Sequence, residues 1–70
     1  MSTAALFSKP GCPYCTAARD DLRHRQVTYV EHDVMADRAA LARMLDLNGG
    51  KRMVPTIVED DQVRVGFHGF

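Results

Sequence analysis

Two cysteines, Cys12 and Cys15, are the residues of this chain whose type and spacing could do redox chemistry. They are its only cysteines and are separated by Pro13 and Tyr14. Two thiols at this spacing can close a disulfide and reopen it, and only the thiolate form attacks another disulfide. An isolated cysteine thiol, with a pKa near ~8.5, is mostly protonated at neutral pH. The elements around the pair therefore decide which sulfur reacts first.

The cysteine pair is predicted to lie at the start of a helix. Residues 4–8 predict a short buried strand that ends at Lys9-Pro10-Gly11, and a helix opens at Cys12 or Pro13, because proline is favoured in a first turn. The positive end of the helix dipole and the charge of Lys9 both favour the thiolate of Cys12. We therefore predict that Cys12 is the nucleophile. Cys15, one turn further in and nearer the core, should keep a higher pKa and resolve the mixed disulfide.

A plain structural disulfide and half of a zinc site are the alternatives for the pair. Zinc usually takes four ligands from paired motifs, and the chain has no second cysteine pair. The three histidines, His24, His32 and His68, show no ligand spacing. We therefore expect no metal site.

The rest of the chain predicts the element order β-α-β-α-β-β. In the first helix, Cys15, Ala18 and Leu22 fall on one face. Residues 26–33 predict a second strand. Two further strands, 56–59 and 62–65, predict a hairpin with its turn at Asp60-Asp61.

The second helix is predicted to begin after Asp37 as N-cap and to end at Asn48-Gly49-Gly50. Its inner face holds Ala40, Leu41, Met44 and Leu45. A strand–helix–strand unit favours a parallel pair with a right-handed crossover, and the hairpin adds antiparallel strands. We predict an α/β fold with a mixed four-stranded sheet and a helix on each face.

Length and charge limit the possible classes of protein. Seventy residues predict one domain, 1–70, and the nine basic and nine acidic residues cancel, which argues against nucleic acid or an anionic membrane as partner. No apolar run approaches the ~20 residues of a membrane span, and the first seven residues do not resemble a signal peptide. We expect a cytoplasmic protein. In such a reducing compartment a close cysteine pair is more often catalytic or metal-binding than structural.

Three motifs together resemble glutaredoxin. They are Ser8-Lys9-Pro10-Gly11-Cys12-Pro13-Tyr14-Cys15, then Met53-Val54-Pro55-Thr56-Ile57 about forty residues on, and Gly66 after the hairpin. The resemblance covers almost the whole chain, and the Pro-Tyr dipeptide favours glutaredoxin over thioredoxin. It implies a minimal thioredoxin-like fold and a thiol–disulfide oxidoreductase that reduces protein disulfides or glutathione mixed disulfides. Glutathione is the implied co-substrate, with no tightly bound cofactor.

The resemblance also implies a set of binding residues. Val54-Pro55 is similar to the cis-proline loop that leaves the Val54 backbone free to pair with an extended substrate; an ordinary edge-strand proline is the alternative. Lys9 and Arg52 are implied to meet a carboxylate of glutathione, although a solvated loop is an equal reading for Arg52. Tyr14 is implied to line the groove, or alternatively to shield the disulfide.

The C-terminal segment departs from the glutaredoxin pattern. Glutaredoxins usually carry Gly-Gly followed by a small or acidic residue and a third helix, whereas this sequence has Gly66-Phe67-His68-Gly69-Phe70. No acidic residue follows Asp61, so the usual partner for the glutathione amino group is missing. Gly-Phe is instead similar to NrdH-redoxins, which are reduced by thioredoxin reductase. Another alternative is a module that holds an iron–sulfur cluster through Cys12 and glutathione, which the proline after Cys12 disfavours.

The missing third helix implies that apolar sheet surface stays uncovered. We expect Phe67 and Phe70 to fold back over part of this surface, or the protein to be a monomer or a weak dimer through it; a truncated chain is the remaining alternative.

Overall fold

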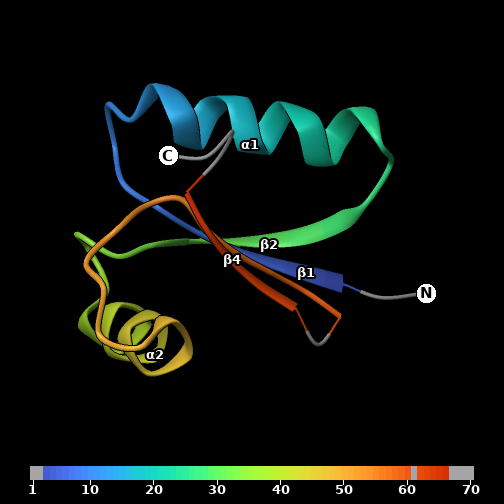
Figure 1. Ribbon diagram of the computed structural model, residues 1–70. Helices are drawn as coiled ribbons and strands as arrows, with labels where there is room; N and C mark the ends of the chain where they lie inside the picture. The colour runs from blue at the N-terminus through green and yellow to red at the C-terminus, as the bar shows by residue number, and fades with distance from the viewer. Residues whose placement is uncertain (1–2, 61, 67–70) are drawn as a thin grey trace.

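A mixed four-stranded sheet with a helix on each face forms the described part of the chain, residues 3–60 and 62–66 of the computed structural model (Figure 1). The elements follow the predicted order: β1 (Thr3–Ser8), α1 (Pro13–His24), β2 (Thr28–Asp33), α2 (Arg38–Asn48), β3 (Thr56–Glu59) and β4 (Gln62–Val65). The predicted architecture is therefore confirmed. Within the described residues there are these two helices and no third.

The strand order in the sheet is β2-β1-β3-β4. β1 pairs with β2 in parallel, with Leu6 opposite Glu31, and with β3 antiparallel, with Leu6 opposite Ile57. β3 and β4 form the predicted antiparallel hairpin, in which Glu59 is opposite Gln62. Asp61, predicted to lie in the turn, is outside the described residues. The result is that β1 and β3 lie inside the sheet while β2 and β4 are its edges.

Helix α2 begins and ends at the capping residues that the sequence predicts, whereas β2 begins two residues later than predicted. Asp37 caps α2 by accepting from the N–H groups of Ala39 and Ala40, at 3.0 and 3.2 Å. Gly49 ends α2 with φ 76°, a left-handed conformation that glycine adopts without steric cost. The second strand, predicted from residue 26, begins at Thr28 because Gln26 has φ 58° and cannot extend a strand.

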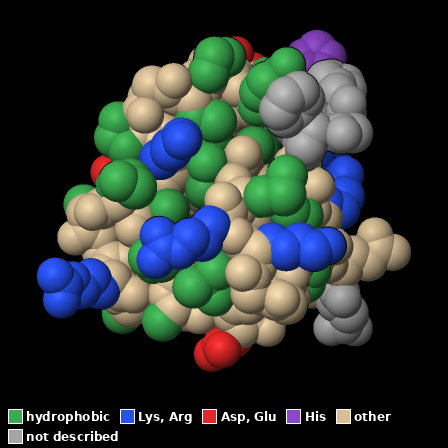
Figure 2. Space-filling model, turned by 60° about the vertical axis from the view of Figure 1, so that its left-hand side comes forward, with side chains coloured by type: hydrophobic (Ala, Val, Ile, Leu, Met, Phe, Trp, Pro, Cys, Tyr) green, Lys and Arg blue, Asp and Glu red, His purple; other side chains and the backbone are tan. Residues whose placement is uncertain are grey.

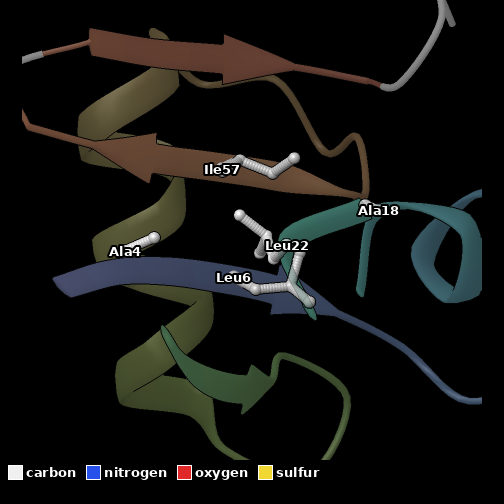
Figure 3. Close-up of a cluster of buried hydrophobic side chains, with 5 residues drawn as sticks. All are labelled: Ala4, Leu6, Ala18, Leu22 and Ile57. Carbon is white, nitrogen blue, oxygen red and sulfur yellow. The ribbon is translucent and has the colours of Figure 1, made fainter. Parts of the chain in front are cut away.

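Two hydrophobic clusters hold the helices to opposite faces of the sheet. Ala4, Leu6, Ala18, Leu22 and Ile57 pack between α1 and the sheet (Figure 3). On the α2 side the buried cluster consists of Phe7, Val34, Ala40 and Met44. Side chains alternate along β1, so it contributes to both clusters and is buried on both faces. The end of β1, from which the cysteine segment continues, is thus fixed from two sides.

The expectation of an uncovered apolar sheet surface is wrong for the described residues. On the α1 face, Ile57 is buried, and the next residue along β3 on that face is Glu59. Arg64, opposite Ile57 in β4, donates to Glu59 Oε1 at 2.6 Å, and Arg25 at the end of α1 donates to Glu59 Oε2 at 3.2 Å. This part of the face therefore carries an ion-pair network. Phe67 and Phe70, expected to cover it, lie outside the described residues.

Neither α1 nor α2 is long and apolar enough to cross a lipid bilayer, and the described part of the chain holds no other helix.

Candidate active site

Cys12 is the N-cap of α1, which agrees with the predicted helix start at Cys12 or Pro13. Its backbone is extended (φ −99°, ψ 109°), and Pro13 is the first helical residue. The Cys15 N–H donates to Cys12 Sγ at 3.2 Å. This N–H belongs to the first turn of the helix, where backbone donors have no partner within the helix. The donor points at the sulfur that would carry the negative charge of a thiolate.

Cys15 lies behind Cys12 on the buried face of α1. Its side chain is 1% exposed and shares that face with Ala18 and Leu22. Burial, and next the hydrogen bond with Cys12, raise the pKa of the Cys15 thiol to about 11. Both cysteines are free thiols. The direction of this pKa shift agrees with the prediction for the thiol that acts second; the role itself stays a prediction.

A surface groove of about 350 Å³ opens at Cys12. Two segments far apart in sequence form it: the residues around the start of α1, and the loop between α2 and β3, which meet at the same end of the sheet (Figure 1). The lining residues are Lys9, Gly11, Cys12, Pro13, Tyr14, Arg52, Met53 and Val54.

The structure brings together most of the residues predicted to bind substrate. Lys9, Tyr14, Arg52 and Val54 all line the groove with Cys12. Tyr14 is 39% exposed, as expected for a residue on the solvent side of the helix start. Pro55 does not line the groove and is fully buried next to it. Their binding roles stay predictions.

The Val54–Pro55 peptide bond is cis, as the resemblance implied. Pro55 precedes β3, which lies inside the sheet, so the alternative of an edge-strand proline is wrong. The Pro55 carbonyl accepts from the N–H of Gly66 at 2.7 Å. The backbone N–H and C=O of Val54 make no hydrogen bond within the described residues, and Val54 is a groove residue. This backbone edge is positioned to pair with an extended chain.

The charges of the groove lining are positive. Among the described residues that line it, Lys9 and Arg52 are the charged ones, and none carries a carboxylate. Figure 2 shows this side of the molecule, where Lys and Arg side chains lie among hydrophobic ones and few acidic side chains are visible. Such a groove favours a ligand with an anionic group.

A hydrogen-bonded ion pair fixes the chain just before the groove. Ser8, the buried last residue of β1, donates its hydroxyl to Glu31 Oε2 at 2.7 Å. Arg19 of α1 donates to both oxygens of Glu31, at 2.8 and 2.5 Å. Hydrogen bonding to Arg19 lowers the pKa of Glu31. The end of β1, α1 and β2 are thereby joined next to Lys9.

Sequence reasoning assigned no binding role to three residues that line the groove: Gly11, Pro13 and Met53. Met53 is the most informative of them, because it is 41% exposed and stands between Arg52 and Val54. The sequence offered a sign of this position, since Met53 belongs to the same motif as the cis proline, Pro55. Within the described residues, no three His, Cys, Asp or Glu side chains are placed to hold a metal ion.

Comparison with known proteins gives the family. Residues 4–64 match the family model for glutaredoxin. A protein of Mycobacterium tuberculosis provisionally named glutaredoxin Rv3198A is 37% identical over 59 residues, which are 81% of this chain and 70% of the relative.

Solved structures agree with this assignment. The thioredoxin-like protein BC3987 is 36% identical, with a TM-score of 0.83 over 91% of this chain and 86% of its own. The glutaredoxin of Archaeoglobus fulgidus shares the fold at 17% identity, with a TM-score of 0.78 over 96% of this chain and 77% of its own. A buckwheat glutaredoxin in complex with glutathione shares it at 22% identity, with a TM-score of 0.75 over 93% of this chain and 61% of its own. The thioredoxin-like fold is thus confirmed. With its cysteine pair at the head of α1 and a family match over residues 4–64, the chain belongs to the glutaredoxin family of thiol oxidoreductases.

Proposed function

We propose that this protein is a glutathione-linked thiol–disulfide oxidoreductase that reduces protein disulfides and glutathione mixed disulfides. The observation that carries the proposal is the position of Cys12, at the N-cap of α1 and in a groove lined by Lys9 and Arg52. Cys15 lies behind it as the second thiol. The buckwheat glutaredoxin that shares the fold is in complex with glutathione, which supports the choice of co-substrate.

The reaction proceeds by two thiolate attacks. The Cys12 thiolate attacks one sulfur of the substrate disulfide; a Cys12–substrate disulfide forms, and the other sulfur leaves as a thiolate that takes a proton from water. Cys15 then loses its proton and attacks Cys12 Sγ, which releases the second substrate thiol and leaves a Cys12–Cys15 disulfide. Two electrons have passed from the dithiol to the substrate. Two glutathione molecules return them and become glutathione disulfide.

A glutathione mixed disulfide needs only Cys12. Attack on the glutathione sulfur releases the protein thiol and leaves glutathione on Cys12, from which a second glutathione removes it. In this path Cys15 forms no disulfide bond. The two substrates therefore place different demands on the two cysteines.

The groove holds the substrate through its backbone and its charge. The free backbone edge of Val54, presented by the cis Val54–Pro55 bond, pairs with the cysteine segment of an extended substrate. Lys9 and Arg52 attract the carboxylate of glutathione, and Tyr14 forms an apolar wall. We place the reaction in the cytoplasm, where glutathione keeps thiols reduced.

A coupled assay tests the proposal. NADPH oxidation is followed with glutathionylated peptide, first with glutathione and glutathione reductase and then with thioredoxin reductase alone. We expect turnover in the first system. Turnover only in the second would contradict the glutathione linkage and indicate an NrdH-like electron donor, the reading that Gly66-Phe67 favours. Visible absorbance of an iron–sulfur cluster after anaerobic purification would instead indicate the cluster-binding alternative.

A further inference from the structure

The side chain of Asn48, the last residue of α2, holds the loop that forms one side of the groove. Asn48 is buried, with 8% of its surface exposed. Its Nδ2 donates to the Lys51 carbonyl at 2.7 Å, and its Oδ1 accepts from the Lys51 N–H at 2.9 Å. One amide side chain therefore satisfies both backbone groups of a loop residue.

Thr56, the first residue of β3, extends this set of contacts to the next part of the loop. Thr56 is fully buried, and its hydroxyl donates to the Met53 carbonyl at 2.8 Å. The same Oγ1 accepts from Asn48 Nδ2 at 3.2 Å. Because the two side chains bond each other, the backbone at Lys51 and at Met53 is tied to the ends of α2 and β3.

The loop has little else to fix it. Residues 50–55 belong to neither helix nor strand, and Gly49 and Gly50 before them both have positive φ. Among the described residues, the other backbone hydrogen bonds that residues 50–55 make lie at the two ends of the loop: the Gly50 N–H donates to the Leu45 carbonyl, and the Gly66 N–H donates to the Pro55 carbonyl. Three residues of this loop line the groove: Arg52, Met53 and Val54. Arg52 lies between the two residues whose carbonyls are held, Lys51 and Met53, and Val54 directly follows the second of them.

We propose that Asn48 and Thr56 are positioning residues of the substrate groove, whose side-chain hydrogen bonds hold Arg52 and Val54 where the substrate binds. The inference rests on the proposed function, because it takes this groove as the substrate site. Neither Asn48 nor Thr56 lines the groove or contacts Cys12 through a hydrogen bond. Their loss should therefore weaken substrate binding more than it changes the reactivity of Cys12.

Paired variants test this inference. Thr56→Val removes the hydroxyl at nearly constant volume, Thr56→Ser keeps it, and Asn48→Ala removes the amide. Asp37→Ala is the matched control, because it removes the capping side chain at the opposite end of α2 and leaves the loop contacts intact. For each variant we would measure kcat and KM with a glutathionylated peptide, and the rate at which iodoacetamide alkylates Cys12.

We expect KM to rise about tenfold in Asn48→Ala and Thr56→Val, because the loop residues that bind the substrate are then no longer held in place before it arrives. Alkylation of Cys12 should stay near the wild-type rate in both. Thr56→Ser and Asp37→Ala should keep a KM close to that of the wild type. The two effects should also be non-additive in the double variant, since the side chains bond each other.

Equal KM values in Thr56→Val, Thr56→Ser and Asp37→Ala would overturn the inference. If Asn48→Ala does not fold, the comparison of Thr56→Val with Thr56→Ser decides. Failure of the proposed function is seen separately, as a wild-type protein that does not turn over glutathionylated peptide. In that event KM is measured for a peptide disulfide, with thioredoxin reductase as the reductant. We again expect a raised KM in Asn48→Ala and Thr56→Val and a KM close to that of the wild type in Thr56→Ser and Asp37→Ala. Equal KM values in Thr56→Val, Thr56→Ser and Asp37→Ala would again overturn the inference.

Discussion

The backbone N–H of Cys15 donates to Cys12 Sγ at 3.2 Å, so the second cysteine supports the sulfur of the first through its main chain while its own thiol stays buried. The backbone contact does not depend on the Cys15 side chain. A substitution of that side chain therefore leaves the hydrogen bond to Cys12 in place, which makes the two roles separable by mutation.

Cys12→Ser should abolish reduction of every disulfide substrate, by at least about a thousandfold, as loss of an attacking nucleophile does. Cys15→Ser should keep most of the activity toward glutathionylated peptide, because the N–H donor to Cys12 remains, but lose activity toward a protein disulfide. Both activities are measured in the coupled assay. Loss of deglutathionylation in Cys15→Ser would show that Cys12 does not act alone in that reaction.

The step carried out by Cys15 should become faster as pH rises. Burial, and next the hydrogen bond with Cys12, raise the pKa of this thiol to about 11 in the reduced protein. Burial, the larger cause, persists when Cys12 is held in a mixed disulfide, so the pKa of Cys15 stays above its ordinary value there. We therefore expect closure of the Cys12–Cys15 disulfide from a Cys12 mixed disulfide to become about tenfold faster per pH unit from about pH 6 to 8. Stopped-flow release of a chromogenic thiol measures it. A rate that levels off near neutral pH would contradict the raised pKa.

Glu31→Gln should lower the free energy of unfolding at neutral pH by about 0.5–1 kcal/mol, since its partner Arg19 is partly exposed and solvent weakens the pair. The folded-state pKa of Glu31 is lowered from 4.5, chiefly by hydrogen bonding to Arg19. Its contribution is therefore present above pH 4.5 and is lost as pH falls through the lowered pKa. Urea unfolding of wild type and variant should differ at pH 7 and converge in acid. Asp46→Asn, exposed on α2 with no ion pair among the described residues, is the control.

Lys9→Met and Arg52→Met should each raise KM for glutathionylated peptide about five- to tenfold and reduce the dependence of KM on salt, because each removes a cation from the groove. Lys51→Met is the matched control: Lys51 precedes Arg52 but does not line the groove. Equal changes of KM in Lys51→Met and Arg52→Met would indicate that Arg52 acts only through the general positive electrostatic field of the loop and makes no specific contact with the substrate. This comparison also decides whether Arg52 is a binding residue or part of a solvated loop.

Local sequence signals predicted the elements and the position of the cysteines. Proline after Cys12, Asp37 at an N-cap and Gly49 after α2 act within a few residues, and each lies where the sequence predicts. The strand boundary at Thr28 was displaced because Gln26 takes a left-handed conformation, which is unusual for a residue other than glycine. The cis bond before Pro55 came from the family resemblance, since the residues themselves do not specify it.

Contacts between distant residues could not be predicted from the sequence. Asn48 looks like an ordinary helix-ending residue, and its bond to Thr56 depends on how α2 and β3 meet. The expected apolar face was wrong for a different reason. That expectation followed from comparison with the glutaredoxin pattern, which has a third helix. In the structure Glu59 follows Ile57 on the α1 face and Arg64 lies opposite Ile57, so charged side chains occupy this face.

Both sides of the groove depend on the central strand. Lys9 directly follows β1, and Val54-Pro55 directly precedes β3, which is hydrogen-bonded to β1. Phe7 and Thr56 pair across these two strands, so the sheet fixes the spacing of the points at which both sides of the groove are attached. Exchange of exposed lining side chains such as Arg52 and Met53 should therefore alter substrate choice without moving the backbone that presents Cys12.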